Sequence, residues 1–483
     1  MPARRPRLAP DRAHDELIDS LARLRVDLGL PTAFPEEVDA AAARAARSVP
    51  TDPALAGRDD LRDLEFLTID PAGSTDLDQA MHLERTATGG ILHYAIADVP
   101  AFVEPGGPVD AEARLRGQTL YAADRRIPLH PVVISEDAAS LLPDRDRLAY
   151  VWRFELDDGA RPVATTLRRA VIRSRAQWTY TGAQVAIDAG AAPPTLQALA
   201  WFGPQRLERE AERGGASLNV PEARVVPGDD GGYRLEREAP LVVEDWNAQV
   251  SLLTGMAAAE LMLRGRVGIL RTMPAAEPDD VAAFRAQTVA LGLPWRLDVA
   301  YGDYLRALDR HDPSALAILD AATGLFRGAG YVAFDGEPPT DPVQSAIGAP
   351  YAHTTAPLRR LVDRWSLIVC EAIANDREVP GWARESLPSL PKIMGRSDAL
   401  ASRLETGTLD RVEAAQLAGR EGRTFDAVVL GRRNGTARVQ LTDPPVAARV
   451  EGLDAAAGTT VRLRLTSADI ATGEIALAPA PAP

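Results

Sequence analysis

Three aspartates, Asp70, Asp76 and Asp78, fall within nine residues directly after an apolar segment. Pro71 and Gly73 favour a loop that bends back on itself, and side chains two positions apart on an extended chain project to the same side. Carboxylates that are packed together raise each other's pKa unless a cation neutralises them, and such oxygen ligands suit Mg²⁺ or Mn²⁺. A metal held in this way can cut phosphodiesters by activating water. On spacing alone, an acidic surface turn that caps a helix is the commoner explanation.

The segments around this cluster predict a mixed α+β region. Residues 64–69 predict a strand that runs into the aspartate loop, and residues 80–85 and 91–97 predict a hairpin with its turn at Gly89-Gly90. Apolar residues then recur with a helical period, which predicts long helices. These helices are expected at residues 244–263, 278–291 and 363–375.

Both ends of the chain differ from this middle region. Residues 1–60 are amphipathic, with Leu17, Leu21 and Leu24 near a helical period, and predict an N-terminal helical module that caps the main domain. Residues 418–483 predict a small closed barrel of OB type followed by a disordered Ala-Pro tail. Its five short strands are expected at residues 424–430, 437–441, 447–450, 460–465 and 475–477.

The bulk composition narrows the class of protein. A net charge of −14 argues against a protein that coats nucleic acid, although a narrow arginine-lined channel can still attract RNA because charges beyond roughly 10 Å are screened. Lys392 is the only lysine, and composition bias explains this excess of arginine better than phosphate binding does. No apolar run is long enough to span a membrane, no secretory signal is present, and the single Cys370 excludes a disulfide framework. We therefore expect a cytoplasmic protein, and the acidic charge favours a monomer.

Five blocks of the chain resemble, in order, the ribonuclease II/R (RNB) family of exoribonucleases. The first resembles the family signature in which Ile-Asp, a short Ser/Thr loop and Asp-x-Asp-Asp-Ala follow one strand. The resemblance implies an RNB-type catalytic domain at residues 61–400 and an OB-type RNA-binding barrel after it. Five ordered blocks are far more specific than one motif. They lie at residues 68–80, 94–106, 110–131, 140–147 and 351–363.

The resemblance assigns chemistry to the aspartates. It implies that Asp70, Asp76 and Asp78 hold Mg²⁺, with Mn²⁺ also possible, and orient the attacking water; Asp78 resembles the residue most closely tied to the chemistry. Gln79 stands where the family has a fourth aspartate. Its carbonyl oxygen can bind a metal but carries no charge, so we expect weaker metal binding with activity retained.

A second group of residues is expected to contact phosphate. Arg359 resembles the family arginine that contacts the scissile phosphate and stabilises its developing charge. Pro357 predicts a helix start, which would place Arg359 and Arg360 in a first helical turn where free N–H groups favour phosphate. His353 is expected to be a structural, hydrogen-bonding histidine rather than a catalytic base.

Further residues are expected to bind RNA. Tyr121 resembles an aromatic residue that clamps a base, and a core tyrosine is an equally good explanation. Tyr180 resembles a tyrosine near the last sugars, and Glu244 is expected to contact the 2′-hydroxyl. In the barrel, Arg432 and Arg433 are the expected phosphate contacts.

These observations predict a hydrolytic 3′→5′ exoribonuclease that threads single-stranded RNA to a buried site and releases nucleoside 5′-monophosphates. A catalytically impaired RNA-binding or regulatory member of the same family is the main alternative, and Gln79 is its chief support. A metal-dependent phosphodiesterase that acts on DNA or small nucleotides is a third possibility.

Overall fold

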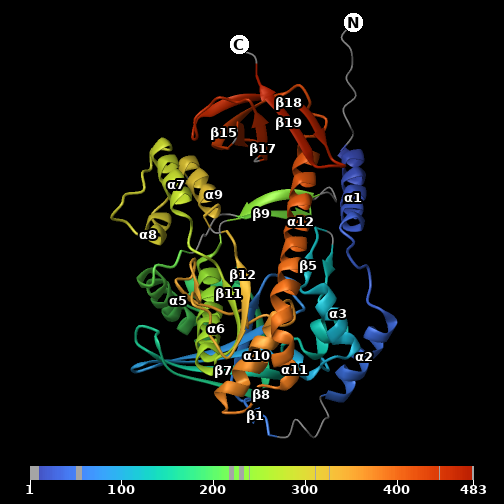
Figure 1. The fold of residues 1–483 in the computed structure, drawn as a ribbon, viewed down its shortest axis with the longest axis vertical. Helices are drawn as coiled ribbons and strands as arrows, with labels where there is room; N and C mark the ends of the chain where they lie inside the picture. Colours follow the sequence, from blue (N-terminus) through green and yellow to red (C-terminus); the bar gives the residue numbers. More distant parts are fainter. Residues whose placement is uncertain are drawn as a thin grey trace.

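The computed structural model describes residues 10–49, 57–123, 125–216, 222–227, 233–238, 240–309, 312–325, 327–433, 435–444 and 446–480. Figure 1 shows a large body of helices around a sheet at one end of the molecule and a smaller barrel at the other. The long helix α12 (Leu390–Leu417) runs along one side and connects the two. The predicted α+β class, with a barrel after the large domain, is confirmed.

A six-stranded sheet carries the aspartate loop. Its strand order is β1-β8-β2-β3-β4-β7, and β7 also pairs with β8, so the sheet closes on itself. Strand β2 runs parallel to β8, so both strands end at the same edge of the sheet. The strands are β1 (Asp59–Asp60), β2 (Phe66–Asp70), β3 (Gln79–Thr86), β4 (Gly89–Ala97), β7 (Asp146–Asp157) and β8 (Pro162–Thr179).

The predicted hairpin is confirmed as β3 and β4, but its turn is not at Gly89-Gly90. Thr86 pairs with Gly89, so the turn residues are Ala87 and Thr88. Both glycines lie in the strand because a side chain has no room there. A Cβ on Gly89 would come within 1.8 Å of a main-chain oxygen of β7, and one on Gly90 within 2.8 Å of the Trp201 ring.

Helices cover both faces of this sheet (Figure 1). One core joins Trp152 of the sheet to Val250 and Trp365 of two long helices, and a second core joins Phe66 to the buried Val38 of a shorter helix. Each fully buried large side chain contributes roughly 1.5–3 kcal/mol to stability. The first core includes residues of the long helices α5 (Pro194–Glu212), α6 (Val242–Gly265) and α10 (Leu361–Ala374), and the second includes residues of α2 (Glu36–Ser48).

Shorter elements connect this framework, and the three predicted long helices are confirmed as α6, α7 and α10. No helix in the described part of the chain is long and apolar enough to cross a membrane. The shorter elements are η3 (Val99–Ala101), α3 (Pro108–Arg116), β5 (Leu120–Tyr121), β6 (Arg126–Ile127), the π-helical η4 (Ile134–Ala138), α4 (Tyr180–Asp188), β9 (Glu222–Pro227), β10 (Tyr233–Glu238), β11 (Val267–Thr272), α7 (Pro278–Ala290), α8 (Tyr301–Arg306), α9 (Pro313–Thr323), β12 (Gly330–Asp335), β13 (Val343–Gln344), β14 (Ala349–Pro350), α11 (Gly381–Ser386) and η5 (Leu387–Ser389).

The predicted N-terminal helical module consists of two helices that pack in different places. Helix α2 packs on the large sheet, whereas α1 (Pro10–Asp27) lies along α12 (Figure 1). Leu17 and Leu21 of α1 form a small core with Val412 and Ile470, and the Ser20 hydroxyl donates to the Ile470 carbonyl at 2.8 Å. Helix α1 therefore ties the connecting helix to the barrel.

The five predicted barrel strands are confirmed, in the order β17-β16-β15-β18-β19. Phe425 is only 9% exposed and belongs to the barrel core. The disordered tail was predicted to span Ala478 to Pro483, and this is wrong at Ala478 and Pro479, which pair with β18 as the end of β19; residues 481–483 lie outside the described residues. The strands are β15 (Thr424–Arg433), β16 (Thr436–Leu441), β17 (Ala447–Glu451), β18 (Thr460–Asp469) and β19 (Glu474–Pro479).

Candidate active site

The site begins at the end of β2, where Asp70 pairs in register with Thr179 of β8. Burial raises the pKa of Asp70 to about 6, although Arg359 opposes the rise. Its Oδ2 atom is buried and has no hydrogen-bond partner among the described residues. A buried carboxylate oxygen without a partner is costly, so this atom is available to a cation or to a hydrogen-bond donor.

The loop after Asp70 is held by one serine. The Ser140 hydroxyl accepts from the main-chain N–H of Leu77 at 2.9 Å and donates to the carbonyl of Thr75 at 2.7 Å. These bonds fix the main chain on both sides of Asp76. The Asp76 charge adds to the raised pKa of both Asp70 and Asp78, so the three predicted carboxylates lie near one another.

Asp78 is buried and joins two segments that lie 280 residues apart in the sequence. Its Oδ1 accepts from the Leu358 N–H at 2.7 Å, and its Oδ2 accepts from Arg359 Nε at 3.0 Å. Burial raises the pKa of Asp78 to about 7, against the opposing effects of Arg359 and the Leu358 hydrogen bond. The predicted meeting of the aspartate loop and Arg359 is therefore present in the fold.

The two arginines after Pro357 are not in a helical turn, so that prediction is wrong. Helix α10 begins at Leu361, with Arg360 as its extended N-cap residue. Arg360 points to Asp363, with Nη2 at 2.8 Å from Oδ2, and this buried aspartate also accepts from the main chain at 2.7 Å. Arg359, whose side chain is 44% exposed, remains accessible beside Asp78.

Gln79 is held by the protein at both ends of its amide. Its Nε2 donates to the Thr355 carbonyl at 2.7 Å, and its Oε1 accepts from the Tyr94 hydroxyl at 2.8 Å. Because a carbonyl can only accept, the amide nitrogen must face Thr355. The Tyr94 hydroxyl also lies 2.8 Å from Ser251 Oγ. The oxygen that was predicted to face a metal is therefore engaged with Tyr94.

Arg126 is a site residue that sequence reasoning missed. It forms ion pairs with Asp76 and, at 2.6 Å, with Glu136. It belongs to the block at residues 110–131, so its presence was visible, but nothing in the sequence indicated which aspartate it meets. Among the residues that the structure describes, no three His, Cys, Asp or Glu side chains are arranged to hold a metal ion.

The predicted base-binding and sugar-binding residues border the cluster. Tyr121, on β5, is 56% exposed. Burial of its hydroxyl end raises its pKa, Arg359 opposes this rise and Asp76 adds to it, so the hydroxyl lies beside the aspartates. Its ring face is open to a stacking partner.

The other two predicted RNA contacts, Tyr180 and Glu244, are both held at the start of α6. Glu244 Oε1 caps that helix by accepting from the Leu241 N–H at 3.0 Å. The Tyr180 hydroxyl accepts from Asn247 Nδ2 at 3.3 Å. Asn247 was missed, although its place three residues after Glu244 puts both side chains on one helix face.

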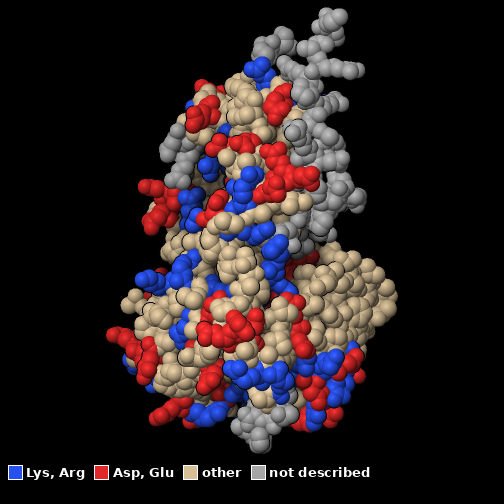
Figure 2. Space-filling model, turned by 90° about the vertical axis from the view of Figure 1, so that its right-hand side faces the viewer, with Lys and Arg blue, Asp and Glu red and all other residues tan. Residues whose placement is uncertain are grey.

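The charges of the barrel differ from those of the site. Arg432 pairs at 2.5 Å with Asp454, whose side chain is 92% exposed. The side chain of Arg433, the other predicted phosphate contact, lies outside the described part of the structure. On the molecular face drawn in Figure 2, basic and acidic side chains lie in small mixed groups. That face therefore offers no broad basic track for RNA.

Comparisons with known proteins identify the class. The family profile described as "RNB domain" matches residues 58–373, and "RNase II-type exonuclease C-terminal S1 domain" matches residues 423–480. The chain therefore belongs to the RNB family, in agreement with the predicted resemblance. The matched domains contain the aspartate loop, Arg359 and the barrel.

Individual relatives match part of their own length. Human "Exosome complex exonuclease RRP44" is 28% identical over 65% of this chain and 34% of its own length. Escherichia coli "Ribonuclease R" is 30% identical over 69% of this chain and 42% of its own length. The chain thus aligns with less than half of the length of each of these two relatives.

Solved structures share the fold. Mycoplasma genitalium RNase R in complex with ribose methylated single-stranded RNA has a TM-score of 0.85 at 17% identity, over 96% of this chain and 78% of its own. Yeast Ssd1, described as a pseudonuclease, has a TM-score of 0.67 at 17% identity, over 85% of this chain and 52% of its own.

Proposed function

We propose that this chain is a hydrolytic 3′→5′ exoribonuclease that degrades single-stranded RNA to nucleoside 5′-monophosphates with a divalent metal. The observation that carries the proposal is the juxtaposition of two buried carboxylates of raised pKa, Asp70 and Asp78, with the accessible Arg359. Membership of the RNB family and relatives named as exonucleases support it.

A divalent cation fits the carboxylates better than it fits Gln79. The unpartnered Oδ2 of Asp70 and the raised pKa values of Asp70 and Asp78 indicate too little positive charge around buried acids. We expect these two aspartates to hold the ion, and Asp76 to join them only by releasing Arg126. Mg²⁺ is the expected metal and Mn²⁺ a substitute, since both prefer oxygen ligands.

The chain's own residues supply binding and charge stabilisation. When bound, the metal supplies an activated water and stabilises the leaving oxygen. Arg359 lies beside Asp78 and can offset the negative charge that develops on phosphate. The exposed ring of Tyr121 stacks on a base, and Tyr180 with Glu244 faces the sugars. Arg360 is expected to act through Asp363 rather than on phosphate.

A catalytically impaired RNA-binding member is the second candidate, and one observation favours it. Gln79 replaces a carboxylate, and both the nitrogen and the oxygen of its amide are hydrogen-bonded within the protein, to Thr355 and Tyr94. The fold neighbour Ssd1 is described as a pseudonuclease. In this reading the site binds RNA without cutting it.

A labelled-RNA assay decides between these proposals. Poly(A) labelled at its 5′ end is incubated with Mg²⁺ or Mn²⁺ and with EDTA, beside Asp78→Asn. Progressive shortening from the 3′ end that needs metal and Asp78 supports the exoribonuclease. RNA binding without shortening at any metal concentration supports the impaired member. A deoxy oligomer cut as fast as RNA would instead favour a general phosphodiesterase.

A further inference from the structure

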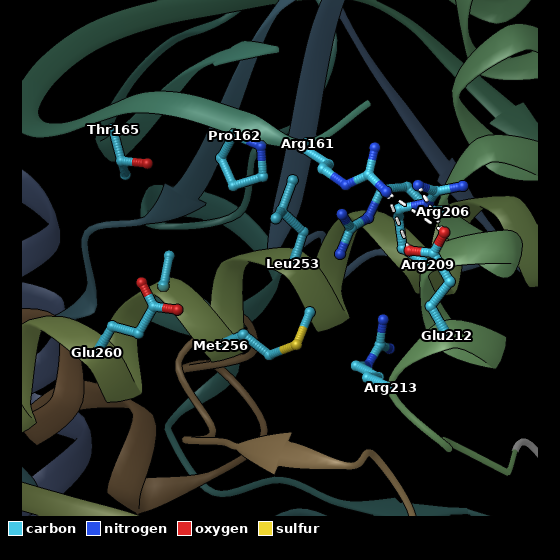
Figure 3. Close-up of a pocket in the computed structure, with 11 residues that line it drawn as sticks. Arg161, Pro162, Thr165, Arg206, Arg209, Glu212, Arg213, Leu253, Met256 and Glu260 are labelled. Atoms are coloured by element: carbon cyan, nitrogen blue, oxygen red, sulfur yellow. Dashed lines mark hydrogen bonds and ion pairs between the residues drawn. The ribbon is translucent and has the colours of Figure 1, made fainter. Parts of the chain in front are cut away.

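A cavity lies away from the aspartates, between the start of β8, the end of α5 and the middle of α6. Its volume is about 340 Å³ (Figure 3). In Figure 3 the arginines gather at one end, the Leu253 and Met256 side chains lie in the middle, and Thr165 and Glu260 lie at the other end. The cavity therefore has a basic end and an apolar floor.

The basic end contains buried arginine N–H groups that have no hydrogen-bond partner among the described residues. Arg206 is 4% exposed; its Nη1 donates to the Ala160 carbonyl at 3.2 Å, but its Nε has no partner among the described residues. The same holds for Arg209 Nε and Arg213 Nη2, both buried atoms. Buried donors of this kind are rare because they lose water without gaining a partner.

The charges at this end are balanced except at Arg206. Burial, together with the nearby charges of Arg213 and Arg161, lowers the pKa of Arg206 to about 10, although Glu210 and Asp157 oppose this. Glu212 is already shared, at 3.1 Å from Arg161 and 2.9 Å from Arg209. Arg209 also pairs with Glu208 at 2.5 Å, and Arg213 lies 4.0 Å from Glu210. Of the four arginines that line the cavity, Arg206 is therefore the one left without an ion pair among the described residues.

We propose that this cavity binds a free phosphate monoester with a partly apolar body, of which a nucleoside 5′-monophosphate is the natural probe. The phosphate lies against Arg206, Arg209 and Arg213, where fixed N–H groups match its oxygens. The body of the ligand covers Leu253 and Met256. This site is independent of the proposed nuclease chemistry, and binding is measured without turnover.

A free mononucleotide suits this cavity better than an RNA chain does. The volume lies at the lower end of the roughly 300–1,000 Å³ that is typical of small-molecule sites. Along α6, Met256 lies about 18 Å from Glu244, at a rise of about 1.5 Å per residue, so the cavity is well separated from the sugar-binding end of that helix.

Calorimetric titration of the full chain in EDTA tests the assignment with adenosine 5′-monophosphate, adenosine and inorganic phosphate. We expect the monophosphate to bind, adenosine to bind at least about tenfold more weakly, and Arg206→Gln or Arg213→Gln to weaken monophosphate binding by about tenfold or more. Arg153→Gln is the matched control, because Arg153 is paired with Glu155 at 2.7 Å and lies outside the cavity. The affinity of Arg153→Gln for adenosine 5′-monophosphate should stay within about twofold of that of the parent.

Each variant is first checked for folding by circular dichroism. Because Arg206 is buried, Arg213→Gln, at a position that is 16% exposed, decides the question if Arg206→Gln does not fold. Absence of monophosphate binding overturns the proposal, as does binding that neither variant weakens or binding of adenosine with equal affinity. Displacement of the monophosphate by an equal concentration of 5′-phosphorylated RNA would assign the cavity to RNA and overturn it as well.

Discussion

The sheet-borne site and the C-terminal barrel use charge in opposite ways. At the site, Asp78 is 3% exposed and its ion pair with Arg359 joins distant segments. In the barrel, Arg432 of β15 pairs with Asp454, which lies 22 residues later, and their side chains are 43% and 92% exposed. Buried charges interact strongly and are held in place, whereas exposed pairs are screened and contribute about 0–1 kcal/mol.

The aromatic residues follow the same division. Tyr121 exposes its ring next to the aspartates, whereas Phe425 of the barrel is buried in the barrel core. The barrel therefore offers little stacking surface on the residues described. Under the proposed function, we therefore expect chemistry and base recognition to concentrate on the sheet, and the barrel to add weaker, salt-dependent contacts.

The largest expected effect comes from Asp78→Asn. The asparagine can still accept from Leu358, but it loses its charge beside Arg359, so we expect single-turnover RNA cleavage to fall by about 10²-fold or more with RNA binding retained. Asp158→Asn is the control, since Asp158 is an exposed aspartate paired with Arg85. Equal cleavage rates for Asp78→Asn and the parent would remove Asp78 from the mechanism.

The second prediction concerns pH and Asp70. The pKa of Asp70 rises from 3.8 to about 6 in the fold, so the folded state favours the protonated carboxyl. The protonated carboxyl therefore contributes to folding stability in full below about pH 4, and this contribution is lost as the pH rises through about 6. In EDTA, Asp70→Asn should therefore raise the free energy of unfolding at pH 8 by up to about 3 kcal/mol, and not at pH 4. Urea unfolding at both pH values measures this. A difference that does not change with pH would contradict it, and Asp137→Asn, at an exposed position, is the control.

Gln79→Asp should have a smaller, two-sided effect. Without metal, loss of the donor to Thr355 and a new buried charge near Asp78 should lower stability by about 1–3 kcal/mol. With Mg²⁺, the added carboxylate should make the melting temperature rise more than it does in the parent. Thermal unfolding with and without Mg²⁺ measures both effects. Gln177→Glu, at an exposed glutamine that is hydrogen-bonded to Ser74, is the control and should show neither the loss of stability nor the larger Mg²⁺ response. If Mg²⁺ raises the melting temperature of Gln79→Asp only as much as that of the parent, position 79 does not face the metal.

The smallest effect is expected from Arg432→Gln in the barrel. Loss of one exposed cation should weaken RNA binding by about threefold or less and reduce the salt dependence by at most about one counterion. Filter binding at several salt concentrations measures both. Arg296→Gln, which removes an exposed arginine paired with Asp298 outside the barrel, is the matched control. A loss of RNA binding of about tenfold or more would contradict the weaker role that the comparison gives to the barrel.

Much of the fold was predictable because its signals are local. Period-two alternation identified β3 and β4, helical periodicity identified α6 and α10, and turn residues separated the five barrel strands. The turn at Ala87-Thr88 was missed because Gly89 and Gly90 are needed for close packing within a strand, which a local pattern does not distinguish from a turn.

The sequence by itself determined the family, the class of fold and the aspartates that stand at the end of β2. Only the tertiary structure decided which cation each acid meets: Arg359 contacts Asp78, Arg126 contacts Asp76, and Arg360 is taken by Asp363. It also turned the Gln79 oxygen to Tyr94. The physical reason is that secondary structure follows from short-range periodicity, whereas partners in a buried polar site come from segments up to 281 residues apart and are chosen by packing.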